Sequence, residues 1–202
     1  MKRLAIATLL MLGISGCITP VSYHIPQSTP KGKVSAGAAI TYWGSTTGFA
    51  TLPYIAPFIR YGLTDYLDFG FGFEGLPVFG LTNLDVKYQF LQGNINGSLR
   101  LGVGAQLVGF VPYASLSFGT NTVYGGLGVQ YWSIEDTSLR FSAKTVTPHG
   151  FIGFMLGGNS VKFVPELNVM VPISEITIFG HKATTSVVIF KVGFGLAYIP
   201  SK

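Results

Sequence analysis

The stretch RYGLTDYLDFGFGFEG, Arg60 to Gly75, decides the fold. Within it an apolar series alternates with a small or acidic one: Leu67, Phe69, Phe71 and Phe73 against Asp68, Gly70, Gly72 and Glu74. Because successive side chains of a β-strand point to opposite sides, this period of two predicts a strand with two chemically different faces. In a soluble sheet the aromatic face would be the core, whereas in a membrane barrel it would contact lipid.

Composition favours the membrane. Charged residues make up 10% of the 202 residues, against about 25% in an ordinary soluble domain. A soluble protein would have difficulty covering its surface with so few charges, and the chain also has 14% aromatic residues and 27 glycines. The length suits one domain, or at most two, with a substantial core.

The body of the chain offers no helical span. A membrane helix needs about 20 mostly apolar residues, but here Gly, Pro or a charge interrupts every apolar run at short intervals. The nearest candidate, SVVIFKVGFGLAYIP at 186–200, alternates and carries Lys191. Since only helices and closed barrels satisfy their backbone groups in lipid, the sequence predicts an all-β fold, an antiparallel up-and-down transmembrane β-barrel.

The N-terminus has the features of a secretory signal. Lys2 and Arg3 precede an apolar run over 4–12, and small residues precede Cys17, so cleavage is expected just before the cysteine. The residues Ile14-Ser15-Gly16-Cys17 resemble the lipobox of bacterial lipoproteins. The resemblance implies that Cys17 becomes the new N-terminus and carries lipid, including palmitate. Residue 18 is Ile rather than Asp, so nothing argues for retention at the inner membrane.

Cys17 is the only cysteine, which excludes a disulfide framework, and lipidation would explain a lone thiol in an exported protein. The alternative is an ordinary signal peptide with an incidental cysteine. Prolines spaced through the following polar residues predict an extended, semi-rigid linker, in which His24 is expected to be solvated. The predicted organisation is a signal peptide over 1–16, a lipid anchor and linker over 17–32, and a barrel over 33–202.

Ten alternating segments follow, which is an even number, as in single-chain bacterial barrels. They are 33–43, 52–62, 66–74, 82–91, 97–108, 110–118, 122–132, 142–157, 160–171 and 185–199. Short turns rich in Gly, Asn and Asp are expected near 63–65, 92–97, 119–121 and 157–159. Longer loops are expected near 44–51, 75–81, 133–141 and 172–184. A lipidated, periplasmic N-terminus would place the short turns in the periplasm and the long loops outside.

One face of these segments is large and apolar, and the other is small or ionic. A lipocalin-like soluble barrel would then expose mainly glycine to water, whereas a membrane barrel with a narrow lumen suits glycine beside a few long polar side chains. We therefore expect the aromatic face to contact lipid. Period two places seven charged residues on the lumen side, where we expect a polar network: Arg60, Asp68, Asp85, Lys87, Arg100, Glu166 and Lys191.

This network has two interpretations. The charges could form a gate or solute site, or they could pair into a plug that fills and rigidifies the lumen, which is the interpretation favoured here. About ten strands are expected to leave little more than room for side chains.

A resemblance supports the membrane interpretation. RYGLTDYLDFGFGF followed by NLDVKYQFL, at 60–73 and 83–91, resembles the hairpin pattern of small, poorly characterised bacterial outer-membrane barrel proteins. The resemblance implies an outer-membrane location in a Gram-negative type envelope, and it implies no catalytic residue.

Residues for catalysis are few. A lipid hydrolase would need a nucleophile, a histidine base and an orienting polar group within hydrogen-bond reach. The candidates are His149 or His181 as the base, with Ser142 or Ser160 and Glu166 as partners. No spacing typical of a metal or cofactor site is present. Cleavage of the signal removes Lys2 and Arg3 and lowers the formal net charge from +5 to +3. The sequence has no basic patch that would support nucleic-acid binding.

The sequence therefore predicts a non-enzymatic outer-membrane lipoprotein barrel with a structural or surface-interaction role. Its partners would be outer-membrane lipid and extracellular ligands or proteins that meet the long loops. A small pore or transport protein is the first alternative, and a lipid-modifying outer-membrane enzyme is the second.

Overall fold

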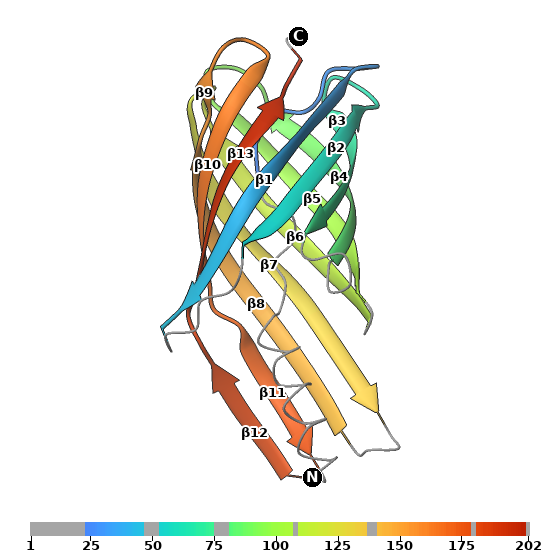
Figure 1. The fold of residues 1–202 in the computed structure, drawn as a ribbon. Helices are drawn as coiled ribbons and strands as arrows, with labels where there is room; N and C mark the ends of the chain where they lie inside the picture. The colour runs from blue at the N-terminus through green and yellow to red at the C-terminus, as the bar shows by residue number, and fades with distance from the viewer. Residues whose placement is uncertain are drawn as a thin grey trace.

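The computed structural model confirms a closed, antiparallel ten-stranded barrel (Figure 1). It describes residues 23–46, 53–74, 81–106, 109–136, 141–178 and 181–200. Within these ranges no helix has the length and apolar character needed to cross a membrane. Neighbouring strands pair in chain order from β1 to β8, and the ring closes through β8, β10, β13 and β1.

The ten barrel strands have the following bounds: β1 (Val34–Ser45), β2 (Tyr54–Gly62), β3 (Leu67–Glu74), β4 (Leu81–Leu91), β5 (Asn96–Gln106), β6 (Gly109–Gly119), β7 (Val123–Asp136), β8 (Phe141–Phe154), β10 (Val161–Met170) and β13 (Ile189–Tyr198). The two-residue strand β9 (Leu156–Gly157) follows β8 and pairs with β10 in the barrel wall. Two shorter strands, β11 (Ile173–Ile178) and β12 (His181–Ser186), lie outside the ring. The closing ladder places Leu167 opposite Ile152, with both of these side chains outside the barrel. Each of the ten predicted segments overlaps one barrel strand.

The loop predicted at 172–184 is wrong, because it contains β11 and the start of β12. This hairpin adds to the first half of β8, where Ile176 pairs with Ala143, and it extends the sheet beyond the barrel (Figure 1). The side chains of β12 are exposed on both faces. The hairpin has no apolar face for lipid, so its sequence lacks the alternation of apolar and polar residues that marks the barrel strands. For this reason the sequence predicts a loop there. The predicted loops at 44–51 and 75–81 lie largely outside the described residues.

The two faces have the predicted orientation. On the outside, Phe71 and Phe194 are each 46% exposed, whereas on the inside Asp68 is 0% and Lys191 is 1% exposed. The same outward series of apolar residues continues on the other strands, including Leu84, Val86, Tyr88, Leu101, Leu127, Phe163, Leu196 and Tyr198. An apolar exterior around a polar interior is the arrangement of a membrane barrel, and it contradicts the soluble lipocalin-like alternative.

Glycines on the lumen face make room for the large polar side chains. Gly70 pairs directly with Arg60, and a Cβ on Gly70 would lie 2.5 Å from an Arg60 guanidinium nitrogen. Gly102 pairs with Tyr113, and an added Cβ would lie 2.6 Å from its hydroxyl. The strand register thus sets each long side chain against a neighbour without one, which explains the glycine-rich inner series of the sequence.

The two ends of the barrel differ. Short turns at 63–66, 92–95 and 120–122 lie at one end, which we call the short-turn end, and the last barrel strand also finishes there. β11 and β12 lie at the opposite end, which we call the loop end (Figure 1).

The exterior assignment makes a prediction about stability. Phe194 lies midway along β13, so replacing it by Arg should destabilise the barrel by about 2 to 4 kcal/mol, the cost of a cation at the bilayer midplane. The measurement is reversible urea unfolding in phospholipid vesicles. Phe194→Leu is the control and should cost far less. Equal stability of the Arg and Leu variants would contradict a lipid-facing Phe194.

Candidate functional site: the occupied lumen

Residues 23–30 lie inside the barrel, and we call them the inner segment. Tyr23 is 3%, His24 is 4% and Thr29 is 1% exposed. The segment leaves the lumen at the short-turn end through Lys31 and Gly32, whose φ of 72° turns the chain into β1. The expectation of a solvated His24 in an outer linker is therefore wrong. Proline spacing indicates an extended backbone, but it carries no information on where that backbone lies.

Side chains of the barrel wall accept hydrogen bonds from the backbone N–H groups of the inner segment. The carboxylate of Glu166 accepts from two successive residues, Tyr23 at 3.2 Å and His24 at 3.0 Å. Nearer the short-turn end, the Ser28 N–H donates to Gln89 Oε1 at 2.8 Å. The Thr29 N–H donates to Asp68 Oδ2, also at 2.8 Å. These bonds replace water for groups that would be costly to bury unpaired.

Wall cations bind the backbone carbonyls of the same segment. Arg100 donates to the Tyr23 oxygen at 3.0 Å. The Lys87 ammonium donates to the oxygens of Ile25, at 3.3 Å, and of Gln27. Anionic and amide wall groups thus bind the N–H groups, and cationic wall groups bind the carbonyls. Pro26 and Pro30 have no N–H, so they bury no donor that needs a partner.

Behind these contacts, five of the predicted lumen residues form one ion-pair cluster. Arg60 lies between two carboxylates, with Nε 2.7 Å from Asp68 Oδ1 and an Nη 2.5 Å from Asp85 Oδ1. Lys87 is 3.3 Å from Asp68, and Arg100 is 3.6 Å from Asp85. All five side chains are at most 6% exposed. Mutual pairing is what allows such charges to be buried, and removal of one partner would strand the others.

Glu166 forms a second cluster around His24. Its carboxylate accepts from the Tyr124 hydroxyl at 2.6 Å and the Asn168 amide at 3.0 Å, and it lies 3.1 Å from His24 Nδ1. The His24 ring also stacks on Phe151 at 3.9 Å between ring centroids. A neutral ring whose Nδ1–H donates to the carboxylate accounts for the contact with Glu166.

Lys191 belongs to neither cluster. Its ammonium lies 2.5 Å from Glu74 Oε1, and both side chains are at most 2% exposed. β13 and β3 are separated by β1 and β2 in the sheet, so this ion pair crosses the lumen. The structure therefore distributes the seven predicted residues over three places: a cluster of five, Glu166 with the inner segment, and Lys191 with Glu74.

The predicted lumen network omitted four wall residues, Glu74, Gln89, Tyr124 and Asn168, as well as His24. Glu74 and Gln89 do lie on the inner face that period two predicts, so the omission was in the choice of residues for the network and not in the face. His24 had no such signal, because the inner segment belongs to no strand.

Neither candidate histidine is hydrogen-bonded to a candidate serine among the described residues. His149 faces the lumen, 5.6 Å from His24 between ring centroids, and its ring nitrogens have no hydrogen-bond partner in the described part of the chain. His181 lies exposed at the start of β12. Ser142 is on β8, opposite Thr177 of the outer hairpin. No group of His, Cys, Asp or Glu in the described ranges could hold a metal ion.

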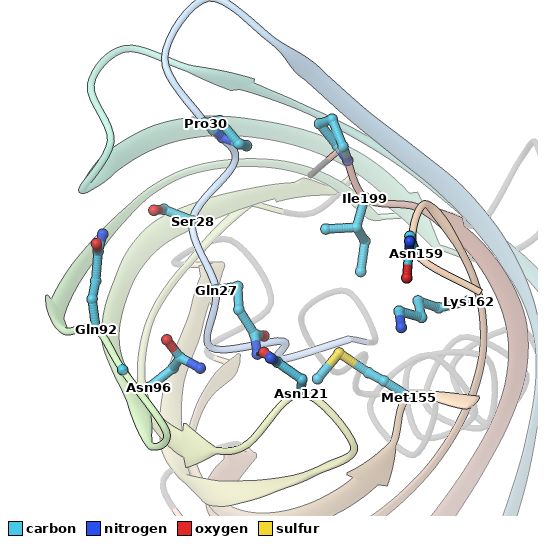
Figure 2. A pocket seen from close by; sticks show the side chains of 12 residues that line it. Gln27, Ser28, Pro30, Gln92, Asn96, Asn121, Met155, Asn159, Lys162 and Ile199 are labelled. Carbon is cyan, nitrogen blue, oxygen red and sulfur yellow. The ribbon is translucent and has the colours of Figure 1, made fainter. Parts of the chain in front are cut away.

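A cavity of about 470 Å³ opens beside the inner segment at the short-turn end (Figure 2). Its lining is rich in amides, from Gln27, Gln92, Asn96, Asn121 and Asn159, with Lys162 as the one cation among the described lining residues. Met155, Ile199 and Pro200 add apolar surface. We call this cavity the vestibule.

Comparisons with known proteins give distant likenesses. No protein-family model matches the chain, and no curated protein matches it significantly. The outer membrane protease OmpT from Escherichia coli aligns with a TM-score of 0.44 and 10% identity, over 82% of this chain and 93% of that one. The NanC porin gives the same three values with 100% of its own chain covered. The outer membrane protein AlkL aligns with a TM-score of 0.40 and 16% identity, over 92% and 98%. The strand pairing of this chain, rather than these likenesses, defines its fold.

The ion-pair cluster makes a prediction. Asp85→Ala removes the carboxylate that both Arg60 and Arg100 contact. We therefore expect the free energy of unfolding to fall by about 3 to 5 kcal/mol, as it does when other buried ion pairs lose one partner. The measurement is the unfolding temperature in detergent, followed by heat-modifiable gel mobility. Glu135→Ala removes an exposed carboxylate and should change little. Equal unfolding temperatures for the two variants would contradict a stabilising cluster.

Proposed function

We propose that the protein is an outer-membrane barrel with a structural or surface-interaction role, closed at rest by its own inner segment. The single observation that carries the proposal is the occupied lumen, in which buried wall charges bind both N–H and carbonyl groups of residues 23–30. A channel open at rest would not place its own backbone across its charged groups. The apolar exterior supports residence in a membrane, and a closed barrel is the all-β solution for that medium.

The outer hairpin supports the surface-interaction part of this role. β7 and β8, each 14 residues long, continue past the barrel at the loop end and carry β11 and β12. The Lys182–Glu175 ion pair joins the two hairpin strands with both side chains more than half exposed, at 62% and 52%. A sheet that leaves the membrane in this way is suited to contact with a partner outside it. In this proposal the partner is an extracellular ligand or protein.

A gated pore is the second candidate. About ten strands are expected to leave little more than room for side chains, but this lumen holds a peptide segment as well as the charged cluster. Displacement of the inner segment would leave a polar passage wide enough for an extended peptide chain. Catalysis is not part of the proposal, since His149 has no hydrogen-bonded nucleophile among the described residues.

The proposal includes a lipid anchor at Cys17, a residue that lies outside the described ranges. Its support is the lipobox-like sequence before it. The anchor and the barrel would fix the protein to the outer membrane independently of each other.

The closed state is tested by conductance. In planar lipid bilayers the wild-type protein should stay at background, because the inner segment occupies the lumen. Gly62→Ala should raise conductance at least tenfold, since an added Cβ would meet the carbonyl oxygens of Pro30 and Thr29, where the segment leaves the lumen. Gly44→Ala is the matched control, because nothing lies within 4 Å of its Cβ position. A steady, selective conductance of the wild type would make the protein a pore open at rest.

The anchor is tested by substitution of its cysteine. Cys17→Ser should leave an uncleaved or mis-sorted precursor that incorporates no labelled palmitate, while the barrel still shows heat-modifiable mobility. Metabolic labelling followed by membrane fractionation gives both readouts. Normal processing of the variant would indicate an ordinary signal peptidase and exclude the lipoprotein assignment.

A further inference from the structure

We propose that the lumen is a binding site for extended peptides and that the inner segment occupies it as an internal ligand. The inference rests on the proposed closed barrel and adds a ligand class to it. Any peptide of about the length of residues 23–30, presented in an extended conformation, would meet the same wall groups once the inner segment has moved.

The first argument is that the wall recognises the backbone. Glu166, Gln89 and Asp68 accept hydrogen bonds from main-chain N–H groups of the segment. Glu166 and Gln89 contact the side chains of His24 and Ser28 as well. Every contact from Arg100 and Lys87 to the segment is made to a carbonyl oxygen. All peptides share these groups. A wall that had only to fill space could do so with apolar side chains, without the desolvation cost of charges.

The second argument is the order of the charges. Near Tyr23 and His24, the Glu166 carboxylate and Arg100 bind N–H and carbonyl groups of the same short stretch. At the other end of the segment, Asp68 and Lys87 repeat this combination around Gln27 and Thr29. Donors and acceptors thus occur at both ends of the path, as an extended main chain presents them. A lipid tail would offer no hydrogen-bond partner to the wall atoms that bind the main chain of the segment, so a peptide is the ligand class that fits.

The third argument is that the site has an entrance and unused polar groups. The vestibule opens directly beside Gln27 and Ser28 at the short-turn end (Figure 2). Within the lumen, both amide atoms of Asn83 and the Gln130 Oε1 atom have no hydrogen-bond partner among the residues that the structure describes, although these two residues are 0% and 3% exposed. Buried polar atoms of this kind are normally satisfied, and a peptide that follows the lumen could supply their partners.

The test separates the inner segment from its barrel after folding. A recognition sequence for a specific protease is inserted after Gly32, which is exposed and whose Cβ position has no atom within 4 Å. The full chain is folded, cut and washed in mild denaturant, and heat-modifiable mobility verifies that the barrel persists. A fluorescent peptide with the sequence YHIPQSTPK, residues 23–31, is then added, and its binding is followed by anisotropy.

Three altered peptides separate backbone recognition from side-chain recognition. N-methylation of His24 and Thr29 removes two donors to the wall and should weaken binding at least tenfold. N-methylation of Ile25 is the matched control, because its N–H has no hydrogen-bond partner in the described structure, and it should weaken binding less than threefold. Alanine in place of both Ile25 and Gln27 removes apolar packing and the Gln27 bonds to Thr120 and Asn121 but keeps the main-chain contacts, so it should weaken binding less than N-methylation of His24 and Thr29 does.

The wall is tested in the same assay. Lys87→Met removes the cation that binds two carbonyls and should weaken binding of the unmodified peptide at least tenfold. Ser117→Ala is the control, because this lumen-facing hydroxyl is hydrogen-bonded to Ser98 rather than to the segment.

The outcomes are distinct. The expected order of the peptides would support the inference, whereas equal binding of the N-methylated peptides or no binding of any peptide would overturn it. If washing unfolds the barrel, the rate at which labelled peptide replaces the native fragment in the unwashed, cut protein is measured by mass spectrometry, with the same expected order. The proposed closed barrel is judged separately, by the conductance of the uncut wild type.

Discussion

A buried polar group is costly without a partner, and this constraint governs the contacts between the inner segment and the barrel wall. Glu166 satisfies two N–H groups of the inner segment together with Tyr124, Asn168 and His24. Removal of the segment would leave that carboxylate, and the cations that bind the segment's carbonyls, with fewer partners in a low-dielectric space. The segment would lose its hydrogen bonds in the same step. The wall and the segment therefore stabilise each other, and neither is a complete structure alone.

The exterior follows from the same physics applied to a different medium. Inter-strand hydrogen bonds satisfy the backbone all round the ring, so the outer surface needs only apolar side chains. Alternation then places a large residue outside for every small or ionic residue inside. The glycine series has a precise packing role, because residues such as Gly70 give space to Arg60 on the neighbouring strand. A bulkier inner series would expel the charged cluster that binds the segment.

The chemistry of the contacts that hold the inner segment in the lumen bears on function. An apolar plug would pack by shape and would leave a lumen unsuited to polar solutes. The inner segment is held by hydrogen bonds and charges that act on its backbone, by side-chain hydrogen bonds such as that of Ser28 to Gln89, and by apolar packing of Tyr23 and Ile25. The polar contacts can be exchanged for those of another peptide or of water. A barrel closed in this way combines a stable resting state with the capacity to accept a ligand. The vestibule beside Gln27 gives that ligand a place to enter.

Period-two alternation alone determined the strands, their faces and the lumen position of residues such as Asp85 and Lys191, because side-chain direction in a strand is a local property. It could not determine that Lys191 pairs with Glu74 while Asp85 pairs with Arg60, since partners across a lumen depend on how the ring closes. The outer hairpin escaped detection for a related reason, because outside lipid a strand needs no apolar face. Above all, the position of residues 23–30 is determined by the tertiary structure and not by their own sequence. An extended polar segment with spaced prolines is equally compatible with water and with a charged lumen, and only the arrangement of the wall's donors and acceptors favours the lumen.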